Sequence, residues 1–235
     1  MAQGSAAEAE SMLTEALAIS KRVRTPDYHA VTLTMLRLAL LYNTDGRYTE
    51  ADKLYREALA IDEKRPGENH PRIANTLNHL GLICQTRGNY SEAEELLKRA
   101  LQIRKQTLSP NDPALAVSLD NLGVLYRKVG KYQESETLYR QALSIEEAHY
   151  GPNHYDVATT LNNLALLYDV QGRYKEAEPL YVRSLCIREA TLGANHMDVA
   201  QSLNNLGSLH HRQGHYLLGK TAKQAISTKS PLINE

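Results

Sequence analysis

A period of 42 residues runs through most of the chain and constrains its fold more than any other feature. Glycine recurs at this interval, and a tyrosine follows each of these glycines by two residues. The glycines are Gly46, Gly88, Gly130, Gly172 and Gly214. Leucine keeps the same step from Leu38 to Leu206, and isoleucine keeps it from Ile19 to Ile187, without insertion or deletion. Self-similarity at a fixed period predicts stacked supersecondary units that bury their apolar faces against their neighbours.

Each period contains the signature of two helices joined by a turn. The first helix carries an apolar stripe at helical spacing, formed by Leu161, Leu164, Ala165 and Tyr168. Gly172 follows, and a glycine there can adopt the left-handed conformation that ends a helix. A second apolar stripe predicts another helix from about Lys175 to Thr191, with small residues where neighbouring backbones approach. The sequence therefore predicts an all-α array of antiparallel helical hairpins.

Polar loops connect the hairpins and carry recognisable capping residues. Pro71 and Pro113 suit the first position of a helix, where the missing N–H has no cost, and Asp112 is a natural N-cap. Histidine recurs in these loops at the repeat period, at His70, His154 and His196. A catalytic group is needed only once, so this recurrence favours helix capping.

The repeat defines seven segments. They are a lone second helix at 5–23, hairpins at 29–66, 70–108, 112–150 and 154–192, a lone first helix at 196–216, and a divergent tail at 217–235. The tail is either a weak capping helix or disordered, and a truncated gene product is a further alternative that the sequence leaves open.

Aromatic residues are restricted to tyrosine, and the repeat explains this bias. The chain has 14 Tyr, no Phe and no Trp. Most of the tyrosines fall at three repeat positions, where we expect the rings to fill the core between hairpins and the hydroxyls to reach its rim. Cys84 replaces one of these tyrosines, which predicts a buried and inert thiol. A reactive thiol at Cys186 is a weaker alternative.

Composition excludes several classes of function. Lys+Arg and Asp+Glu number 27 each, so the chain lacks the basic footprint of a general nucleic-acid binder. No apolar stretch is long enough to span a membrane, and no secretory signal precedes the repeats. His210, His211 and His215 lack an acidic or Cys partner nearby, which argues against a metal site. No phosphate loop or catalytic constellation is visible, so we expect a cytoplasmic non-enzyme without cofactors.

The pattern resembles the tetratricopeptide repeat. In that repeat the first helix carries a large residue, Leu, a small residue and Tyr in this order. The turn and second helix then carry Gly, Tyr, a small residue, an aromatic residue and a small residue. The segments LNNLALLY and GRYKEAEPLY carry this likeness in the fourth hairpin. The usual period is 34 residues, and the 42-residue form is similar to the repeats of kinesin light chains and nephrocystins. The resemblance implies a right-handed superhelical solenoid with first helices on its concave wall, and an association with the cytoskeleton or cilium.

Residues beside the core stripe of the first helices would line a groove on that wall. Asparagine amides there can hold the backbone of an extended peptide, and basic residues can pair with acidic side chains or a carboxylate. The predicted partner-binding residues are Arg37, Asn78, His79, Asn121, Arg127, Lys128, Asn162, Asn163, Asn204, Asn205 and Arg212. The alternative is that these asparagines bond locally and stabilise helix packing.

Two functions are therefore open at the level of sequence. The first is an adaptor or scaffold that binds short extended peptide segments of other proteins, acidic motifs among them, as the likeness to kinesin light chains implies. The second is a structural piece that assembles with its own copies through the ends of the array. An enzyme would need unlike catalytic groups that break the repeat, and none is visible.

Overall fold

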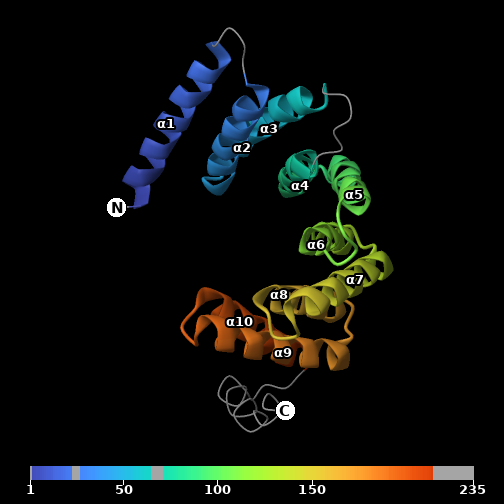
Figure 1. The fold of residues 1–235 in the computed structure, drawn as a ribbon. Coiled ribbons are helices and arrows are strands. Elements are labelled where there is room, and N and C mark those ends of the chain that lie inside the picture. The colour runs from blue at the N-terminus through green and yellow to red at the C-terminus, as the bar shows by residue number, and fades with distance from the viewer. Residues whose placement is uncertain (1, 23–26, 65–70, 214–235) are drawn as a thin grey trace. The chain divides into compact units, whose positions relative to one another are not determined.

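The chain folds into α-helices, in agreement with the sequence prediction (Figure 1). The computed structural model describes residues 2–22, 27–64 and 71–213, with side chains from residue 7 onward, and these residues contain no strand. The helices are α1 (Ala2–Arg22), α2 (Tyr28–Thr44), α3 (Tyr48–Asp62), α4 (Pro71–Thr86), α5 (Tyr90–Thr107), α6 (Pro113–Lys128), α7 (Tyr132–Tyr150), α8 (Tyr155–Val170), α9 (Tyr174–Leu192) and α10 (Met197–Arg212). The predicted tail at 217–235, and with it Gly214, His215 and Tyr216, lies outside the described residues, as does His70.

The helices form two compact units, Met1–Leu108 and Ser109–Glu235. In the first unit, α2 pairs with α3 and α4 pairs with α5, and α1 packs on α2. In the second unit, α6 pairs with α7 and α8 pairs with α9, and α10 packs mainly on α9. Within each unit the second helix of one hairpin also packs on the next first helix, α3 on α4, α7 on α8 and α9 on α10.

Each hairpin closes with a glycine in the left-handed conformation, as the pattern predicts. Gly130 has φ of 80°, and the backbone N–H of Lys131 donates to the carbonyl oxygen of Tyr126 at 2.8 Å. Gly46, Gly88 and Gly172 adopt the same conformation. The bond from the residue after the glycine satisfies a carbonyl that the helix end leaves unpaired. The second helix then begins at the repeated tyrosine.

The predicted caps of the first helices are confirmed. Pro71 and Pro113 are the first residues of α4 and α6. The Asp112 side chain accepts from the backbone N–H of Ala114 at 2.9 Å. Nδ1 of His154 and Nδ1 of His196 each accept from the backbone N–H two residues ahead at 3.2 Å. His154 and His196 are therefore structural N-caps.

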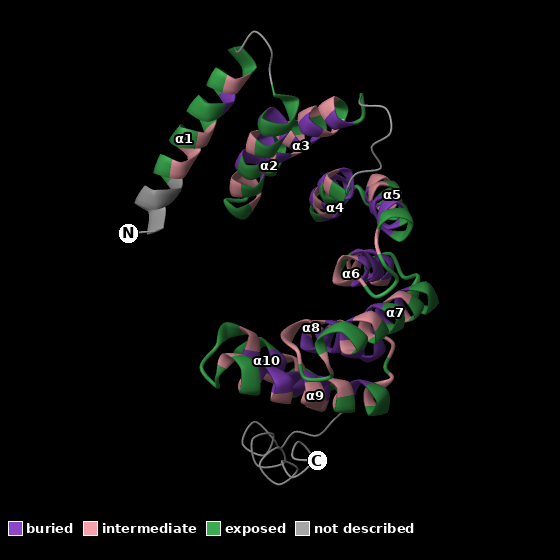
Figure 2. Cartoon of the chain, in the orientation of Figure 1, coloured by how far each residue is buried: buried purple, intermediate pink, exposed green. Residues whose placement is uncertain are grey.

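The core consists mainly of leucine, alanine and tyrosine. Buried residues alternate with exposed ones along each hairpin helix, as expected for helices with one covered face (Figure 2). Tyr55, Tyr139 and Tyr181, in the middle of the second helices, are at most 1% exposed. Their hydroxyl oxygens are buried without a hydrogen-bond partner among the described residues. The expectation that tyrosine hydroxyls reach the rim is therefore wrong for these three rings, because their position in the second helix directs them into the centre of the core. It holds for Tyr168, whose hydroxyl donates to Glu136 at 2.8 Å.

A buried ion pair joins the two hairpins of the first unit. Asp62 ends α3 and is 1% exposed, and Arg72 lies in the first turn of α4. The Arg72 guanidinium donates to both carboxylate oxygens of Asp62, at 2.8 and 2.9 Å. Such a two-pronged pair fixes geometry as well as neutralising a charge removed from water.

Replacing Leu122 with Ala should destabilise the protein by about 2–5 kcal/mol, because the side chain is 3% exposed and its removal leaves a cavity in the core of α6. Chemical denaturation followed by circular dichroism measures this change. Leu40→Ala, at a side chain 46% exposed, is the control and should change the free energy of unfolding by less than about 0.5 kcal/mol. Equal effects of the two substitutions would contradict the core assignment.

Arg72→Ala should destabilise the protein by about 3–5 kcal/mol, because it leaves the carboxylate of Asp62 buried without its cation. Arg99→Ala removes an exposed pair with Glu63 and should cost at most about 1 kcal/mol. Denaturation of the two variants under identical conditions compares them. A loss below about 1 kcal/mol for Arg72→Ala would mean that the pair does not hold the junction together.

Candidate functional site

All eleven residues predicted to bind partners lie on first helices. They are Arg37 on α2; Asn78 and His79 on α4; Asn121, Arg127 and Lys128 on α6; Asn162 and Asn163 on α8; and Asn204, Asn205 and Arg212 on α10. The first three belong to one unit and the other eight to the other. The predicted residues therefore form two groups, one in each unit.

In the first unit, two of the three predicted residues are engaged in packing. Asn78 is 5% exposed. The His79 ring stacks on Tyr55 with centroids 5.2 Å apart. Burial, with the charge of Arg104, lowers the pKa of His79, so the ring stays neutral at pH 7. Arg37 is exposed and available to solvent. The binding role predicted for Asn78 and His79 would use residues that already form part of the core.

In the second unit, asparagines link successive first helices. Nδ2 of Asn163 on α8 donates to both carboxylate oxygens of Asp120 on α6, at 2.9 and 3.2 Å. Nδ2 of Asn205 on α10 donates to Oδ1 of Asn162 on α8 at 2.9 Å. These bonds agree with the alternative prediction, in which the asparagines bond locally and stabilise helix packing. An amide has two donor hydrogens and an acceptor, so one inter-helix bond does not exhaust either side chain.

The predicted basic residues of this unit differ in what they contact. Arg212 donates to Asp169 at 2.7 Å, so its charge is already paired. Arg127 is half-buried, and its positive charge opposes the burial that raises the pKa of Asp120. Lys128 is exposed at the end of α6. The first helices of this unit therefore carry the carboxylates of Asp120 and Asp169 beside the predicted cations.

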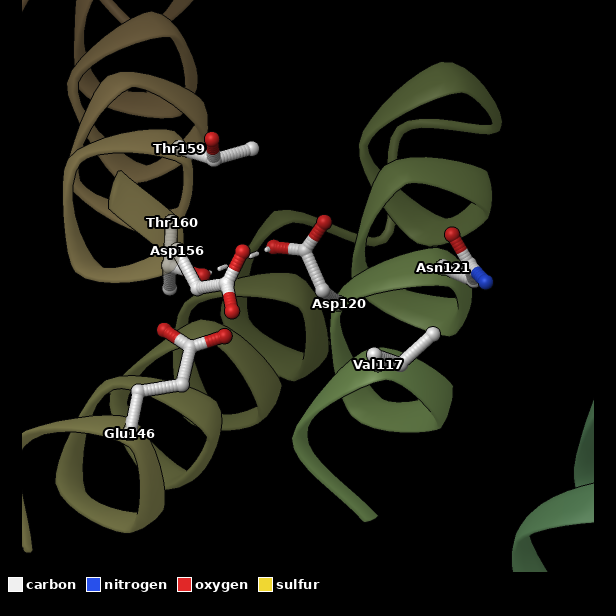
Figure 3. A pocket seen from close by; sticks show the side chains of 7 residues that line it. All are labelled: Val117, Asp120, Asn121, Glu146, Asp156, Thr159 and Thr160. Carbon is white, nitrogen blue, oxygen red and sulfur yellow. Dashed lines mark hydrogen bonds between the residues drawn. The ribbon is translucent and has the colours of Figure 1, made fainter. Parts of the chain in front are cut away.

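A cavity of about 200 Å³ lies between α6, α7 and α8. Its lining residues are Val117, Asp120, Asn121, Glu146, Asp156, Thr159 and Thr160. The carboxyl groups of Asp120, Glu146 and Asp156 point toward one another across this space (Figure 3). None of the lining residues is basic. The cavity is thus a strongly acidic feature in a chain without net charge.

Burial changes the ionisation of two of these carboxyl groups. Removal from water raises the pKa of Asp120 to about 6, against hydrogen bonds from Asn163 and Thr160 that favour the charged form. Burial also raises the pKa of Glu146 to about 8, assisted by the negative charges of Asp120, Asp156 and Glu147. Glu146 is 5% exposed, and its Oε2 has no hydrogen-bond partner among the described residues.

Sequence analysis missed Glu146, although the repeat contains a signal that would have found it. Steps of 42 residues from Glu146 reach Asp62, Arg104 and Arg188. All four side chains are at most 5% exposed. A position that is polar in each of these repeats, on the helix that otherwise supplies the apolar stripe, is a sign of a specific electrostatic role.

Neither thiol is activated. Cys84 is 2% exposed, as predicted, and burial raises its pKa to about 11. Burial also raises the pKa of Cys186. Because the thiolate is the nucleophile, a raised pKa works against reactivity.

His210 and His211 lie in the last turn of α10, and His215 is outside the described residues. Within the described ranges, no group of three His, Cys, Asp or Glu side chains is placed to hold a metal ion. No described helix has the length and apolar character needed to cross a membrane.

The repeats match a family model described as the tetratricopeptide repeat. The matched segments overlap and are residues 1–64, 31–106, 72–148, 115–190 and 156–217. Together they cover nearly all of the chain. No curated protein matches the sequence.

Solved structures show the same fold. BtubC (BKLC) from P. vanneervenii has a TM-score of 0.78 at 21% identity, over 95% of this chain and 90% of that one. Two crystal structures from Podosopora anserina, described as kinesin light chain with nearly identical TPR-like repeats, have TM-scores of 0.67 and 0.66 at 25% identity. In each case the similarity covers 83% of this chain and 90% of the other chain.

Tetratricopeptide repeats typically mediate contacts between proteins, and the fold is typical of adaptors that are not enzymes. The 42-residue period, the glycine turns, the capped first helices and the matches to family and structures agree. This chain belongs to the tetratricopeptide repeat family, and its repeats are of the kinesin light chain type.

Proposed function

We propose that this protein is a non-catalytic adaptor that binds extended peptide segments of other proteins along its first helices. The observation that carries the proposal is the cavity between α6 and α8. Asp120 and Asn121, two of its seven lining residues, occupy the repeat positions of the predicted groove residues Asn162 and Asn163. A hollow on that face offers a place for a side chain of a bound segment.

The polar groups beside the cavity suit the backbone of such a segment. An extended peptide presents unpaired N–H and C=O groups on both sides, and asparagine can satisfy either kind. Asn163 and Asn205 are held in place by their bonds to neighbouring first helices. Side chains that are already fixed lose little conformational entropy when a ligand binds.

The proposal extends to the charge of the bound segment and to the location of the protein in the cell. Arg37 and Lys128 are exposed and favour acidic side chains near them. The likeness to kinesin light chain repeats favours a cytoplasmic protein associated with the cytoskeleton or the cilium.

Selection from a display library of random peptides should yield ligands with a shared motif. The double variant Asn121→Ala, Asn163→Ala should bind a selected peptide about tenfold more weakly, since roughly two neutral hydrogen bonds would be lost. Fluorescence anisotropy with the labelled peptide measures the affinity.

The matched control is Gln133→Ala, Gln141→Ala, which removes two amides from exposed positions of α7. It should bind the peptide as the wild type does. Circular dichroism checks that both variants keep their helicity. Selection without a shared motif, or equal losses in both variants, would refute binding along the first helices.

An exposed apolar stripe on α1 favours a second candidate, assembly with other copies of the chain. Met12 is 70% exposed and Ile19 is 57% exposed, one heptad apart on the same side of the helix. Ile103 and Ile187 occupy the same repeat position as Ile19 and are at most 6% exposed. The stripe is the kind of surface that a neighbouring helix covers elsewhere in the array.

If copies associate through α1, the weight-average mass in sedimentation should rise with concentration. Met12→Glu with Ile19→Glu should then keep the protein monomeric, because burying carboxylates in the contact is costly. Met197→Glu, at a residue 78% exposed on α10, is the control and should leave the association unchanged. A wild-type mass that is independent of concentration would rule out this candidate.

A further inference from the structure

One buried polar position recurs near the end of each second helix and can be compared across repeats. Ten residues later, a second position lies at the start of the next first helix. The pairs are Asp62 with Arg72, Arg104 with Ala114, Glu146 with Asp156, and Arg188 with Asp198. Because the repeats share one geometry, the four pairs can be compared for the group that each buried polar residue meets at its hairpin junction.

Each of the four buried residues has a hydrogen-bond partner within the protein, but Glu146 is the acid whose partner is a neutral hydroxyl, that of Thr160. Asp62 binds Arg72 through two hydrogen bonds. Arg104 donates to Oδ1 of Asn75 at 2.6 Å. Arg188 donates to Oγ of Ser202 at 2.9 Å and to the backbone oxygen of Asp198 at 3.1 Å. The rule at these junctions is that the buried charge meets a complementary group.

The junction at Glu146 differs from that at Asp62, because Glu146 has a hydrogen bond with Thr160 where Asp62 has a cation. The position that holds the Arg72 guanidinium in the first unit holds the Asp156 carboxyl here, so two acids occupy the place of an ion pair. Asp120 adds a third carboxyl group at a position that is asparagine in α4, α8 and α10. Glu146 is 5% exposed, and its carboxyl group points into the cavity (Figure 3). Its Oε2 has no hydrogen-bond partner among the described residues.

The cavity has the size and chemistry for one organic cation. Its volume of about 200 Å³ is below the roughly 300–1,000 Å³ of typical small-molecule pockets and suits a single side chain. A metal ion would need three or more ligands converging within bonding distance. The described residues contain no such group, in this cavity or elsewhere.

We propose that the cavity between α6, α7 and α8 binds the guanidinium or ammonium group of an Arg or Lys side chain from a partner peptide. The peptide as source of the cation rests on the proposed function, whereas cation binding itself rests on the cavity. The incoming group takes the place that Arg72 fills in the first unit. Glu146 pairs with it in the interior, and Asp156 and Asp120 contact it from the first helices on either side.

Binding should depend on pH because the empty site favours the protonated form of Glu146. The pKa of Glu146 is raised to about 8 in the empty cavity, and a bound cation would lower it. The ionised form of Glu146, which can pair with a cation, therefore becomes more populated as the pH rises through 8. Asp120 faces Glu146 from α6, with the nearby charge of Arg127. Asp156 and Thr160 face it from α8, which the capping His154 precedes, and the Thr160 hydroxyl makes a hydrogen bond with it. Glu147, the next residue of α7, adds its negative charge from outside the cavity.

The test measures binding of N-acetyl-arginine amide to the full chain by NMR chemical-shift titration. N-acetyl-citrulline amide, which has nearly the same shape and no charge, is the matched ligand. We expect the arginine compound to shift the amide signals of Asn121, Thr159 and Thr160 and to bind at least about tenfold more tightly than the citrulline compound. Its affinity should be about tenfold or more lower at pH 6.5 than at pH 8.5, given a Glu146 pKa of about 8.

Two variants separate the buried carboxylate from general charge. Glu146→Gln should weaken binding of the arginine compound at least about tenfold and remove most of its dependence on pH. Glu147→Gln removes the same charge from the next residue of α7, which lies outside the cavity and pairs with Arg183. It should leave the affinity within about twofold of the wild type. Equal affinities of the two variants for the arginine compound would overturn the proposal.

A third variant supplies the missing cation from within. Asp156→Arg places a guanidinium at the position equivalent to Arg72, so we expect it to pair with Glu146 and abolish binding of the arginine compound. The melting temperature should rise by about 2–4 °C, the shift that a modest gain in stability gives a chain of this size. Lost ligand binding together with a lower melting temperature would indicate disruption of the fold and would count against the pocket.

The remaining outcomes distinguish this inference from the proposed function. Tight binding of spermidine without binding of the arginine compound would indicate that the ligand is a free polyamine. That result would overturn the proposal that a peptide side chain supplies the cation. Shifts of the same amide signals by Ca²⁺ alone would replace the organic cation with a metal. Absence of any shift at millimolar arginine compound would refute the pocket, while peptides selected from the library could still bind along the first helices.

Discussion

Packing of the central residue of each second helix is the interaction on which the rest of the structure depends. Tyr55, Tyr139 and Tyr181 are at most 1% exposed, and Leu97 occupies the same repeat position at 0%. A hairpin of this length cannot bury its apolar stripe alone, so its stability comes from the neighbour that covers this residue. The buried tyrosine hydroxyls forgo a hydrogen bond, which limits the net gain from burying these large rings. The gain is therefore mainly the apolar area that the ring removes from water.

Local sequence rules predicted most of this frame. Gly130 adopts the left-handed conformation that its place after α6 requires, and Asp112 caps that helix because a short acceptor there satisfies an unpaired N–H. Both outcomes depend on a few adjacent residues. The period of 42 then transfers each assignment to the other repeats, so one well-understood hairpin predicts the rest.

The candidate site could be predicted only in part, because its properties depend on residues in different repeats. Asn163 looked available from its place beside the core stripe, but it donates to Asp120, which is 43 residues earlier. The place of His79 beside the core stripe predicts a groove residue, and the stripe alone does not predict that its ring stacks on Tyr55 in the preceding hairpin. Periodicity predicts which face of a helix a residue occupies. It does not predict whether the neighbouring repeat carries a group that pairs with it.

Repetition of the frame leaves each hairpin junction free to vary in charge. The residue at the Glu146 position is acidic, basic, acidic and basic along the chain, and all four are buried to a similar degree. The backbone tolerates either sign because a complementary group, such as Arg72 for Asp62, can come from the next first helix. A junction without that group does not need to unfold, since its carboxyl group can remain protonated. An acid at position 156, where the first unit has Arg72, leaves Glu146 without a cation from the next first helix, and it makes the junction complementary to a cation from another molecule. Salt weakens such a buried contact less than it weakens an ion pair on the surface.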